Sequence, residues 1–387
     1  MPVIILVADG ARADAFDHAF ARGELPALAR LRAEGGMHPI TTVFPSVTGP
    51  AYAPFVTGRF PGPIGLPGLR WYDRARDRCR RPPHCRSYLG SEMRHMDGDL
   101  DAGTPTLFEL ARSRLGAMSM IGRGARRREH LGRGLRLIAR IARAHISGDV
   151  RAWLDIDRIV ARSAIERIRE RRPEFSLVAL LGLDKTSHAT GHDSDDARTA
   201  LRALDEIVAE LRAETERDGR WEETHLWIVS DHGHSPVRAH DDVATVVREA
   251  GHRVIAHPWV WARRPDAAVM VSGNAMAHIY LELARRERPW WPALRGRWEP
   301  LAEALLERES VDLLLLPHSP TRCEVRSRAR GAALVEREGE RYAYRPLTGD
   351  PLGVGEHPAL DHRDSHDALA PSDYPDAVVQ IAHLAGS

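Results

Sequence analysis

The sequence predicts an α/β fold, a three-layer α/β/α sandwich with a mainly parallel sheet. Residues 3–8, 177–183 and 225–230 are apolar runs rich in Val, Ile and Leu, which is typical of strands buried on both faces of a parallel sheet. Amphipathic helical patterns separate these runs, as the crossover connections of a parallel sheet require. Because the alternation continues along the chain, we expect residues 1–387 to form a single domain.

Helical patterns follow the first and the second strand. Phe16, Phe20, Leu25, Leu28 and Leu31 recur at helical spacings, and Gly35-Gly36 ends that pattern. Residues 194–211 form another amphipathic pattern, in which Asp195 and Asp196 suit the positive end of the helix dipole. This second helix returns the chain from the second strand to the third.

The remaining segments predict shorter elements of both kinds. We expect helices around residues 242–250 and 301–306, and strands at residues 39–44, 267–272, 277–283 and 311–316. Residues 332–344 have the pattern of a β-hairpin that turns at Glu338-Gly339.

Residues 111–172 differ in character and predict a helical, Arg-rich insertion within the domain. One face of the helical pattern carries Leu135 and Ile138, and another carries Arg136, Arg140 and Arg143. An ordinary solvated insertion explains this composition. A basic amphipathic helix can also lie on an anionic membrane surface or line a phosphate-binding cap, and these alternatives stay open.

Composition limits the classes of partner and the compartment. A net charge of +1 with 28% charged residues argues against a general nucleic-acid binder. Cys79, Cys85 and Cys323 are too few and too irregularly spaced for a disulfide framework or a zinc knuckle, which fits a reducing compartment. Cys79 and Cys85 flank His84 and could bind a metal, although thiols in a loop are the simpler interpretation.

The N-terminus and the hydropathy predict a cytoplasmic protein. Met1-Pro2 leads directly into the first strand without a basic, cleavable leader. No apolar run approaches the roughly 20 residues that a membrane-spanning helix needs. The sequence gives no indication of the oligomeric state.

Acidic and histidine side chains stand at the ends of the three main strands. Asp9 follows the first strand, Asp184 and His188 follow the second, and Asp231-His232 follows the third. Aspartate oxygen and histidine nitrogen together suit zinc, manganese or iron. Five ligands are too many for one tetrahedral ion, so the pattern predicts two ions about 4 Å apart, a recurring arrangement for phosphoryl transfer.

A nucleophile is expected in the loop of residues 44–58. This loop offers Ser46, Thr48 and Thr57, and a hydroxyl bound to a cation ionises more readily than a free one. Such a residue could attack phosphorus and form a covalent phosphoenzyme. Spacing alone does not choose among the three, and each could instead cap a helix or stabilise a turn.

The order of these motifs resembles the alkaline phosphatase superfamily, closest to its type I phosphodiesterase / nucleotide pyrophosphatase branch. The resemblance rests on Asp9, on Thr48-Gly49-Pro50 nine residues before Thr57-Gly58, on Asp184 with His188, and on Asp231-His232-Gly233. It covers residues 1 to about 234 and implies an alkaline phosphatase-like catalytic domain.

The resemblance also implies a function and a role for each site residue. Thr48 would be the nucleophile that forms a phosphothreonine intermediate. Asp9, Asp231, His232 and the Thr48 oxygen would hold one divalent ion, most simply zinc, and Asp184 and His188 would hold the other. The expected activity is metal-dependent hydrolysis of a small-molecule phosphoric ester, of the phosphodiesterase or nucleotide pyrophosphatase type.

One family ligand has no direct counterpart in this chain. The family takes a further histidine for the second ion from a His-Gly segment near the C-terminus, and no His-Gly follows His234. His366 is the best substitute, ahead of His357 and His362, and the alternative is a histidine beyond Ser387. We expect His192 and His234, each beside a ligand, to orient their neighbours.

Two other classes of function remain open. The same fold could hydrolyse phosphonates or transfer a phosphoryl group to an acceptor, since such relatives share the metal ligands. Alternatively, the chain could be a non-catalytic binding protein that uses the Arg-rich helices at a membrane surface.

Overall fold

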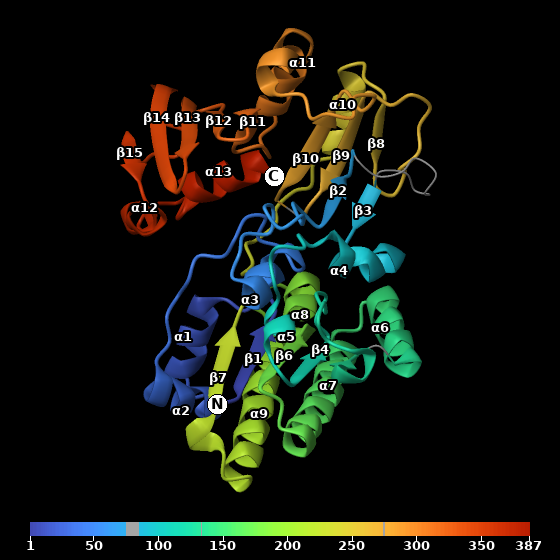
Figure 1. Ribbon diagram of the computed structural model, residues 1–387, viewed down its shortest axis with the longest axis vertical. Coiled ribbons are helices and arrows are strands. Elements are labelled where there is room, and N and C mark those ends of the chain that lie inside the picture. Colours follow the sequence, from blue (N-terminus) through green and yellow to red (C-terminus); the bar gives the residue numbers. More distant parts are fainter. Residues whose placement is uncertain (75–84, 133, 274) are drawn as a thin grey trace.

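The computed structural model describes residues 1–74, 85–132, 134–273 and 275–387 (Figure 1). Its central sheet is parallel and has the strand order β5-β4-β6-β1-β7. The strands are β1 (Val3–Ala8), β4 (Arg114–Ala117), β5 (His130–Leu131), β6 (Phe175–Leu180) and β7 (His225–Val229). β1 pairs with β6 on one side and with β7 on the other, so these three strands end at the same edge. The prediction of a central parallel sheet is confirmed.

Two layers of helices and loops cover this sheet, because alternate residues of each strand point to opposite faces. Ile4, Leu6 and Ala8 of β1 pack on the side of α1 (Ala13–Ala21), α2 (Pro26–Gly35), α7 (Val150–Arg171) and α9 (Asp195–Arg217). Val7 packs on the other side, against residues from α3 (Ala53–Thr57), α4 (Met96–Asp99), α5 (Leu107–Leu110) and the loops between them. The predicted helices at residues 16–31 and 194–211 are therefore present, as α1, α2 and α9.

Residues 111–172 are only partly helical. Helix forms as α6 (Leu135–Ser147) and α7, but residues 114–117 and 130–131 are the strands β4 and β5 of the central sheet. The helical prediction is wrong for these residues. Leu115 and Ala117 are buried in the sheet, so their tertiary packing decides their conformation over the local pattern.

The chain after β7 builds two further sheets, which lie in the upper half of Figure 1. The first has the order β10-β9-β8, from β8 (Val254–Ala256), β9 (Ala267–Val271) and β10 (Ala277–Leu281). The second is antiparallel, from β11 (Leu314–Ser319), β12 (Arg322–Ser327), β13 (Gly331–Glu338), β14 (Arg341–Gly349) and β15 (His357–Leu360). β13 and β14 are the predicted hairpin.

Four helices accompany these sheets. They are α10 (Val243–Glu249), α11 (Trp291–Leu306), α12 (His362–Leu369) and α13 (Ala377–Gly386). Residues 39–44 are not a strand, in contrast to the prediction. Thr42 instead ties this segment to two distant places, because its hydroxyl donates to the backbone oxygen of Asp231 and its backbone oxygen accepts from Gln380 Nε2 of α13 at 2.9 Å.

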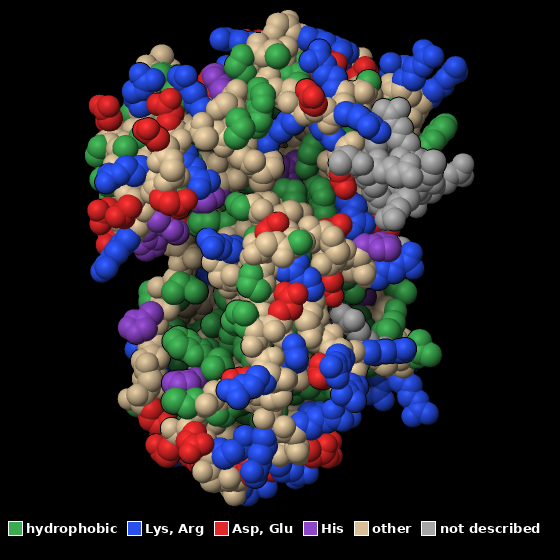
Figure 2. Space-filling model, in the orientation of Figure 1, with side chains coloured by type: hydrophobic (Ala, Val, Ile, Leu, Met, Phe, Trp, Pro, Cys, Tyr) green, Lys and Arg blue, Asp and Glu red, His purple; other side chains and the backbone are tan. Residues whose placement is uncertain are grey.

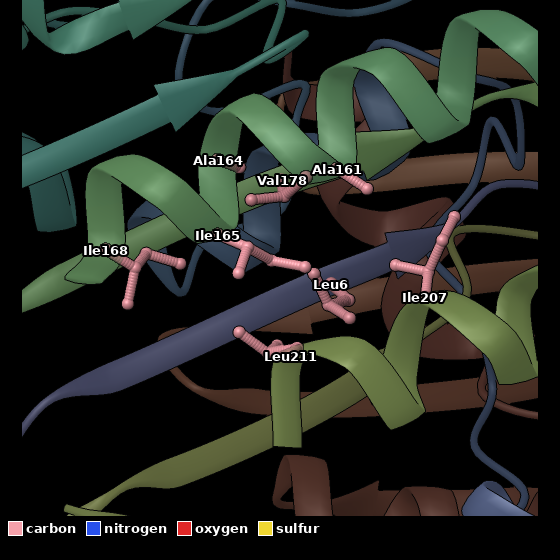
Figure 3. Close-up of a pocket in the computed structure, with 8 residues that line it drawn as sticks. All are labelled: Leu6, Ala161, Ala164, Ile165, Ile168, Val178, Ile207 and Leu211. Carbon is pink, nitrogen blue, oxygen red and sulfur yellow. The ribbon is translucent and has the colours of Figure 1, made fainter. Parts of the chain in front are cut away.

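No helix in the described ranges is both long enough and apolar enough to cross a membrane. Figure 3 shows a small gap between the sheet, α7 and α9, and its lining is wholly apolar, including Leu6, Ala164 and Ile207. A site for a polar or charged ligand requires polar groups that converge on it. This gap therefore belongs to the hydrophobic core, and the chemistry lies at the strand ends.

Candidate active site

Asp9 is fixed immediately after β1 and is fully buried. Its Oδ2 accepts a hydrogen bond of 2.7 Å from the Tyr52 hydroxyl. The next residue, Gly10, donates its backbone N–H to Asp231 Oδ1 at 3.2 Å. This bond links the carboxyl ends of β1 and β7, so Asp9 and Asp231 lie side by side at the sheet edge.

Thr48 is the one hydroxyl of the three candidates that reaches the acidic residues. Its Oγ1 donates to Asp9 Oδ1 at 3.1 Å and lies 3.1 Å from His232 Nε2. Thr57 instead donates to the Ala53 backbone oxygen within α3, and Ser46 is exposed. Of these three hydroxyls, that of Thr48 is therefore the one that lies at the acidic cluster.

Asp184 lies in the first turn of α8 (Gly182–Thr190), the helix that follows β6, and its side chain is 1% exposed. Lys185 Nζ lies 2.7 Å from Asp184 Oδ2, and His188 Nε2, one helical turn later, lies 3.2 Å from Oδ1. The spacing of four residues places both side chains on one helix face, as expected. Asp184 thus has basic side chains close to both of its oxygens.

The segment after β7 contributes two imidazoles. His232 Nε2 lies 3.5 Å from Asp9 Oδ1, 3.4 Å from Asp231 Oδ2 and 4.0 Å from Asp184 Oδ1. His234 Nε2 lies 3.4 Å from Asp184 Oδ1. The sequence predicts that His234 only orients a neighbouring ligand, whereas its ring lies within the acidic cluster. Its spacing of two from His232 was the available signal, because such residues share one side of an extended segment.

Two sets of donor atoms could each hold a metal ion. Asp9, Asp231 and His232 form one set and Asp184, His232 and His234 the other, and within each set all donor atoms lie within 4.8 Å of one another. Among the described residues, Asp184 Oδ1, Asp231 Oδ2 and His234 Nε2 are buried and make no hydrogen bond. Because unsatisfied buried anions and lone pairs are unfavourable, this donor set fits divalent cations.

The carboxylates of the cluster have opposite electrostatic environments. Burial, together with the negative charges of Asp231 and Asp184, raises the pKa of Asp9 well above its ordinary value. Burial likewise raises the pKa of Asp231, to about 7. Burial alone would raise the pKa of Asp184 as well, but the nearby His188, His234 and Lys185 outweigh it and lower that pKa.

The other predicted histidines lie elsewhere. His366 is on α12, where its Nδ1 is 3.6 Å from Asp367 Oδ1, and His362 Nε2 lies 3.2 Å from Asp376 Oδ1. His357 is buried within β15. Within the described ranges, no donor set contains any of these three residues. The alternative site at Cys79 and His84 lies outside the residues that the structure describes.

Comparisons with known proteins identify the family of this chain. Residues 3–335 match the type I phosphodiesterase / nucleotide pyrophosphatase family. No curated protein sequence matches the chain.

Solved structures share the fold. Murine ectonucleotide pyrophosphatase / phosphodiesterase 5, an inactive variant in complex with AMP, is 16% identical with a TM-score of 0.50 over 79% of this chain and 69% of its own. The human protein of that name is also 16% identical, with a TM-score of 0.50 over 81% of this chain and 72% of its own. Phosphonoacetate hydrolase from Sinorhizobium meliloti 1021, in complex with phosphonoformate, is 18% identical with a TM-score of 0.48 over 73% and 69%.

Proposed function

Because this chain belongs to the type I phosphodiesterase / nucleotide pyrophosphatase family of the alkaline phosphatase superfamily, we propose that it hydrolyses a phosphodiester or nucleotide pyrophosphate through Thr48. Family membership makes the chain a metal-dependent hydrolase of phosphoric ester bonds that acts on a small-molecule phosphoester. The proposal adds the nucleophile, a phosphothreonine intermediate and a pair of divalent ions, with zinc as the first choice over manganese or iron.

The observation that supports the proposal best is the position of the Thr48 hydroxyl, 3.1 Å from both Asp9 Oδ1 and His232 Nε2. We assign Asp9, Asp231, His232 and the Thr48 oxygen to one ion, and Asp184 and His188 to the other. When bound, the ions would lower the pKa of the Thr48 hydroxyl and neutralise charge that develops on the phosphate oxygens.

The protein groups orient the nucleophile. Asp9 Oδ1 and His232 Nε2 both lie within hydrogen-bond distance of Thr48 Oγ1 and hold it beside the proposed ion site. The Tyr52 hydroxyl holds the other oxygen of Asp9, which fixes the carboxylate plane. In the proposed reaction the bond from Thr48 Oγ1 to phosphorus forms while the bond from phosphorus to the leaving alcohol breaks. Water then attacks phosphorus and releases Thr48.

The direct test compares Thr48→Ala with Thr48→Ser on a chromogenic phosphodiester. Removal of the hydroxyl should lower turnover by about 10³-fold or more, while the metal content measured by elemental mass spectrometry persists. Thr48→Ser keeps a hydroxyl near the same place and should retain part of the activity. Wild-type turnover in Thr48→Ala would show that the nucleophile is a different group.

A substrate panel separates the proposal from its catalytic alternatives. Rates on a nucleotide diester, a phosphate monoester and a phosphonate should rank the diester first. A phosphonate ranked first would favour phosphonate hydrolysis, and a phosphorylated acceptor alcohol among the products would favour phosphoryl transfer. The non-catalytic alternative requires that all three substrates remain intact when the protein holds its metal.

For the Arg-rich segment we propose that α6 contacts an anionic membrane surface. Leu137, Ile141 and Ala144 face the protein, whereas Leu135 and Ile146 are each 85% exposed on the opposite side of the helix. The exposed Arg136, Arg140 and Arg143 run beside this apolar ridge. Figure 2 shows hydrophobic and basic side chains together over this edge of the molecule. Such a pairing suits acyl chains below anionic headgroups.

Vesicle sedimentation tests this surface. Vesicles that contain phosphatidylserine should bind the protein, and vesicles of phosphatidylcholine alone should bind it less. Replacing both Leu135 and Ile146 by Ser should weaken binding, whereas Leu347→Ser, at an exposed site on β14, should not. Equal binding of the double variant and the wild type would exclude α6 as the contact.

A further inference from the structure

We infer that His234 supplies a nitrogen ligand to the second metal ion, beside Asp184 and His188, and that His357, His362 and His366 are not needed there. The inference rests on the two-ion site of the proposed function. It assigns to His234 a direct role in binding, where the sequence predicts only the orientation of a neighbour.

The ring nitrogen of His234 points to an atom that it does not hydrogen-bond. Nε2 lies 3.4 Å from Asp184 Oδ1, and among the described residues both atoms are buried without a hydrogen-bond partner. The His234 side chain is only 10% exposed, so water gives little compensation. When Nε2 carries no proton, its lone pair and the carboxylate oxygen repel each other at this distance, and a divalent cation bound between them would satisfy both atoms.

The neighbouring imidazoles surround the same carboxylate oxygen. The rings of His188 and His234 meet edge to face, with centroids 4.8 Å apart, and His232 and His234 do so at 5.6 Å. Asp184 Oδ1 lies 3.2 Å from His188 Nε2 and 4.0 Å from His232 Nε2. One carboxylate oxygen thus faces three imidazole nitrogens, a donor set that matches zinc in its preference for nitrogen and oxygen.

The residue two positions after β1, Gly10, has no side chain where the His234 ring lies. Gly10 has φ +73°, and a Cβ at this position would lie 2.5 Å from His234 Nε2 and 3.1 Å from the Asp184 Cα. A side chain on residue 10 would therefore displace the imidazole from Asp184. Arg12 holds the same segment from outside, because its guanidinium donates to the His234 backbone oxygen. Both features fix the His234 ring in the cluster.

The C-terminal histidines have other surroundings. α12, which carries His362 and His366, packs against β14, β15 and α13, all of them parts of the antiparallel sheet region. His362 lies beside Asp376 and His366 beside Asp367. His234 lies three residues after Asp231 and is positioned by β7, so the second ion would not need a ligand from α12.

Metal binding to the protein tests the inference without recourse to activity. The apoprotein is titrated with Zn²⁺, and the number of bound ions and their dissociation constants are measured by calorimetry and elemental mass spectrometry. Wild type should bind two ions. His234→Gly should bind the second ion more than about 100-fold more weakly, beyond the usual effect of a residue that only orients a ligand. His366→Ala is the matched control and should bind both ions as the wild type does.

Added imidazole distinguishes a lost ligand from a damaged fold. In His234→Gly, free imidazole can occupy the vacated space, so it should restore binding of the second ion. Two ions at wild-type affinity in His234→Gly would overturn the inference, as would loss of the second ion in His366→Ala alone. Failure of imidazole to restore binding would also count against a ligand role. A wild-type protein that binds fewer than two ions would instead contradict the proposed two-ion function itself.

Discussion

The two halves of the candidate site handle negative charge in opposite ways. In the Asp9 half, made of Asp9, Thr48, Asp231 and His232, the two carboxylates are fully buried and their pKa values are raised. In the Asp184 half, made of Asp184, Lys185, His188 and His234, the carboxylate pKa is lowered. His188 and His234 account for most of this lowering, and Lys185, with Nζ 2.7 Å from Asp184 Oδ2, adds to it.

This difference in charge indicates which half of the site should bind its ion more tightly. Within the described residues, the carboxylates of the Asp9 half have no Lys or Arg side chain within ion-pair distance, so a bound cation would relieve their mutual repulsion. The Asp184 half already contains the ammonium group of Lys185, which would repel a second cation. We therefore expect stepwise binding, in which the Asp9 half fills first.

The largest expected effect comes from the Asp9 half. Asp231→Asn keeps the shape of the side chain but removes the charge that holds the first ion, so turnover should fall by about 10³-fold. Elemental mass spectrometry should find one ion fewer per protein. Asp367→Asn, on the exposed face of α12, is the matched control and should change neither quantity. Undiminished turnover in Asp231→Asn would remove this residue from the site.

In the metal-free protein, Asp231 should contribute stability as the pH falls from 8 to 5, whereas the partly buried His278 and His383, whose pKa values are lowered to about 4, act in the opposite direction. Asp231 has a folded pKa of about 7 against an ordinary 3.8, so its ionisation disfavours the folded state above pH 7 and has no such effect once it is protonated in both states. The raised pKa of His188 acts in the same direction in this window. The shift for Asp231 alone corresponds to a few kcal/mol in the free energy of unfolding.

Thermal unfolding in the presence of a chelator measures this dependence. Asp231→Asn should make the free energy of unfolding depend less on pH. Some dependence should remain, because burial also raises the pKa of Asp157 to about 7. In the metal-loaded protein the trend should reverse, since protons compete with the ions for the carboxylates. The same pH dependence in the wild type and in Asp231→Asn would contradict the raised pKa of Asp231 and with it the electrostatic contrast between the halves.

The positive charge of Lys185 should weaken the binding of the second ion. Lys185→Met keeps the length of the side chain and removes its charge, so we expect the dissociation constant of the second ion to fall by roughly tenfold. Lys185→Arg retains the charge and should bind that ion much as the wild type does. Weaker binding in Lys185→Met, measured by calorimetry, would instead show that the ammonium group supports the second ion.

The smallest effect concerns Tyr52. Tyr52→Phe removes the donor to Asp9 Oδ2 and should lower the free energy of unfolding of the metal-free protein by about 1 kcal/mol. Tyr88→Phe is a close control, because the buried Tyr88 hydroxyl makes no hydrogen bond to any described residue. Its removal should be neutral. Equal losses in the two variants would mean that the Tyr52 hydrogen bond contributes nothing specific.

The parts of the site that were predictable are those that local sequence encodes. Apolar runs that end in Asp9, Asp184 and Asp231 give both the strands and the edge at which their carboxyl ends meet. The spacing of four between Asp184 and His188 placed both on one face of α8. These features follow from periodicity, so the sequence alone was sufficient for them.

Other features depend on contacts between distant segments and were not predictable. The position of His234 depends on the room above Gly10, and the choice of Thr48 over Ser46 depends on the path of its loop past β1. Leu115 and Ala117 took strand geometry only because β6 offered a partner. In each case the deciding neighbour lies more than 30 residues away in the chain or on another element, where local patterns carry no information.

β7 is the last strand of the central sheet and, among the described strands, hydrogen-bonds only to β1. Its Trp227 side chain is 59% exposed, so little packing covers this edge. The strand that leads into Asp231, His232 and His234 is thus hydrogen-bonded on one side only, so it can separate from its neighbour more easily than an inner strand. Cations bound between these residues and Asp9 or Asp184 would act as cross-links, and the rigidity of this edge would then depend on the metal supply.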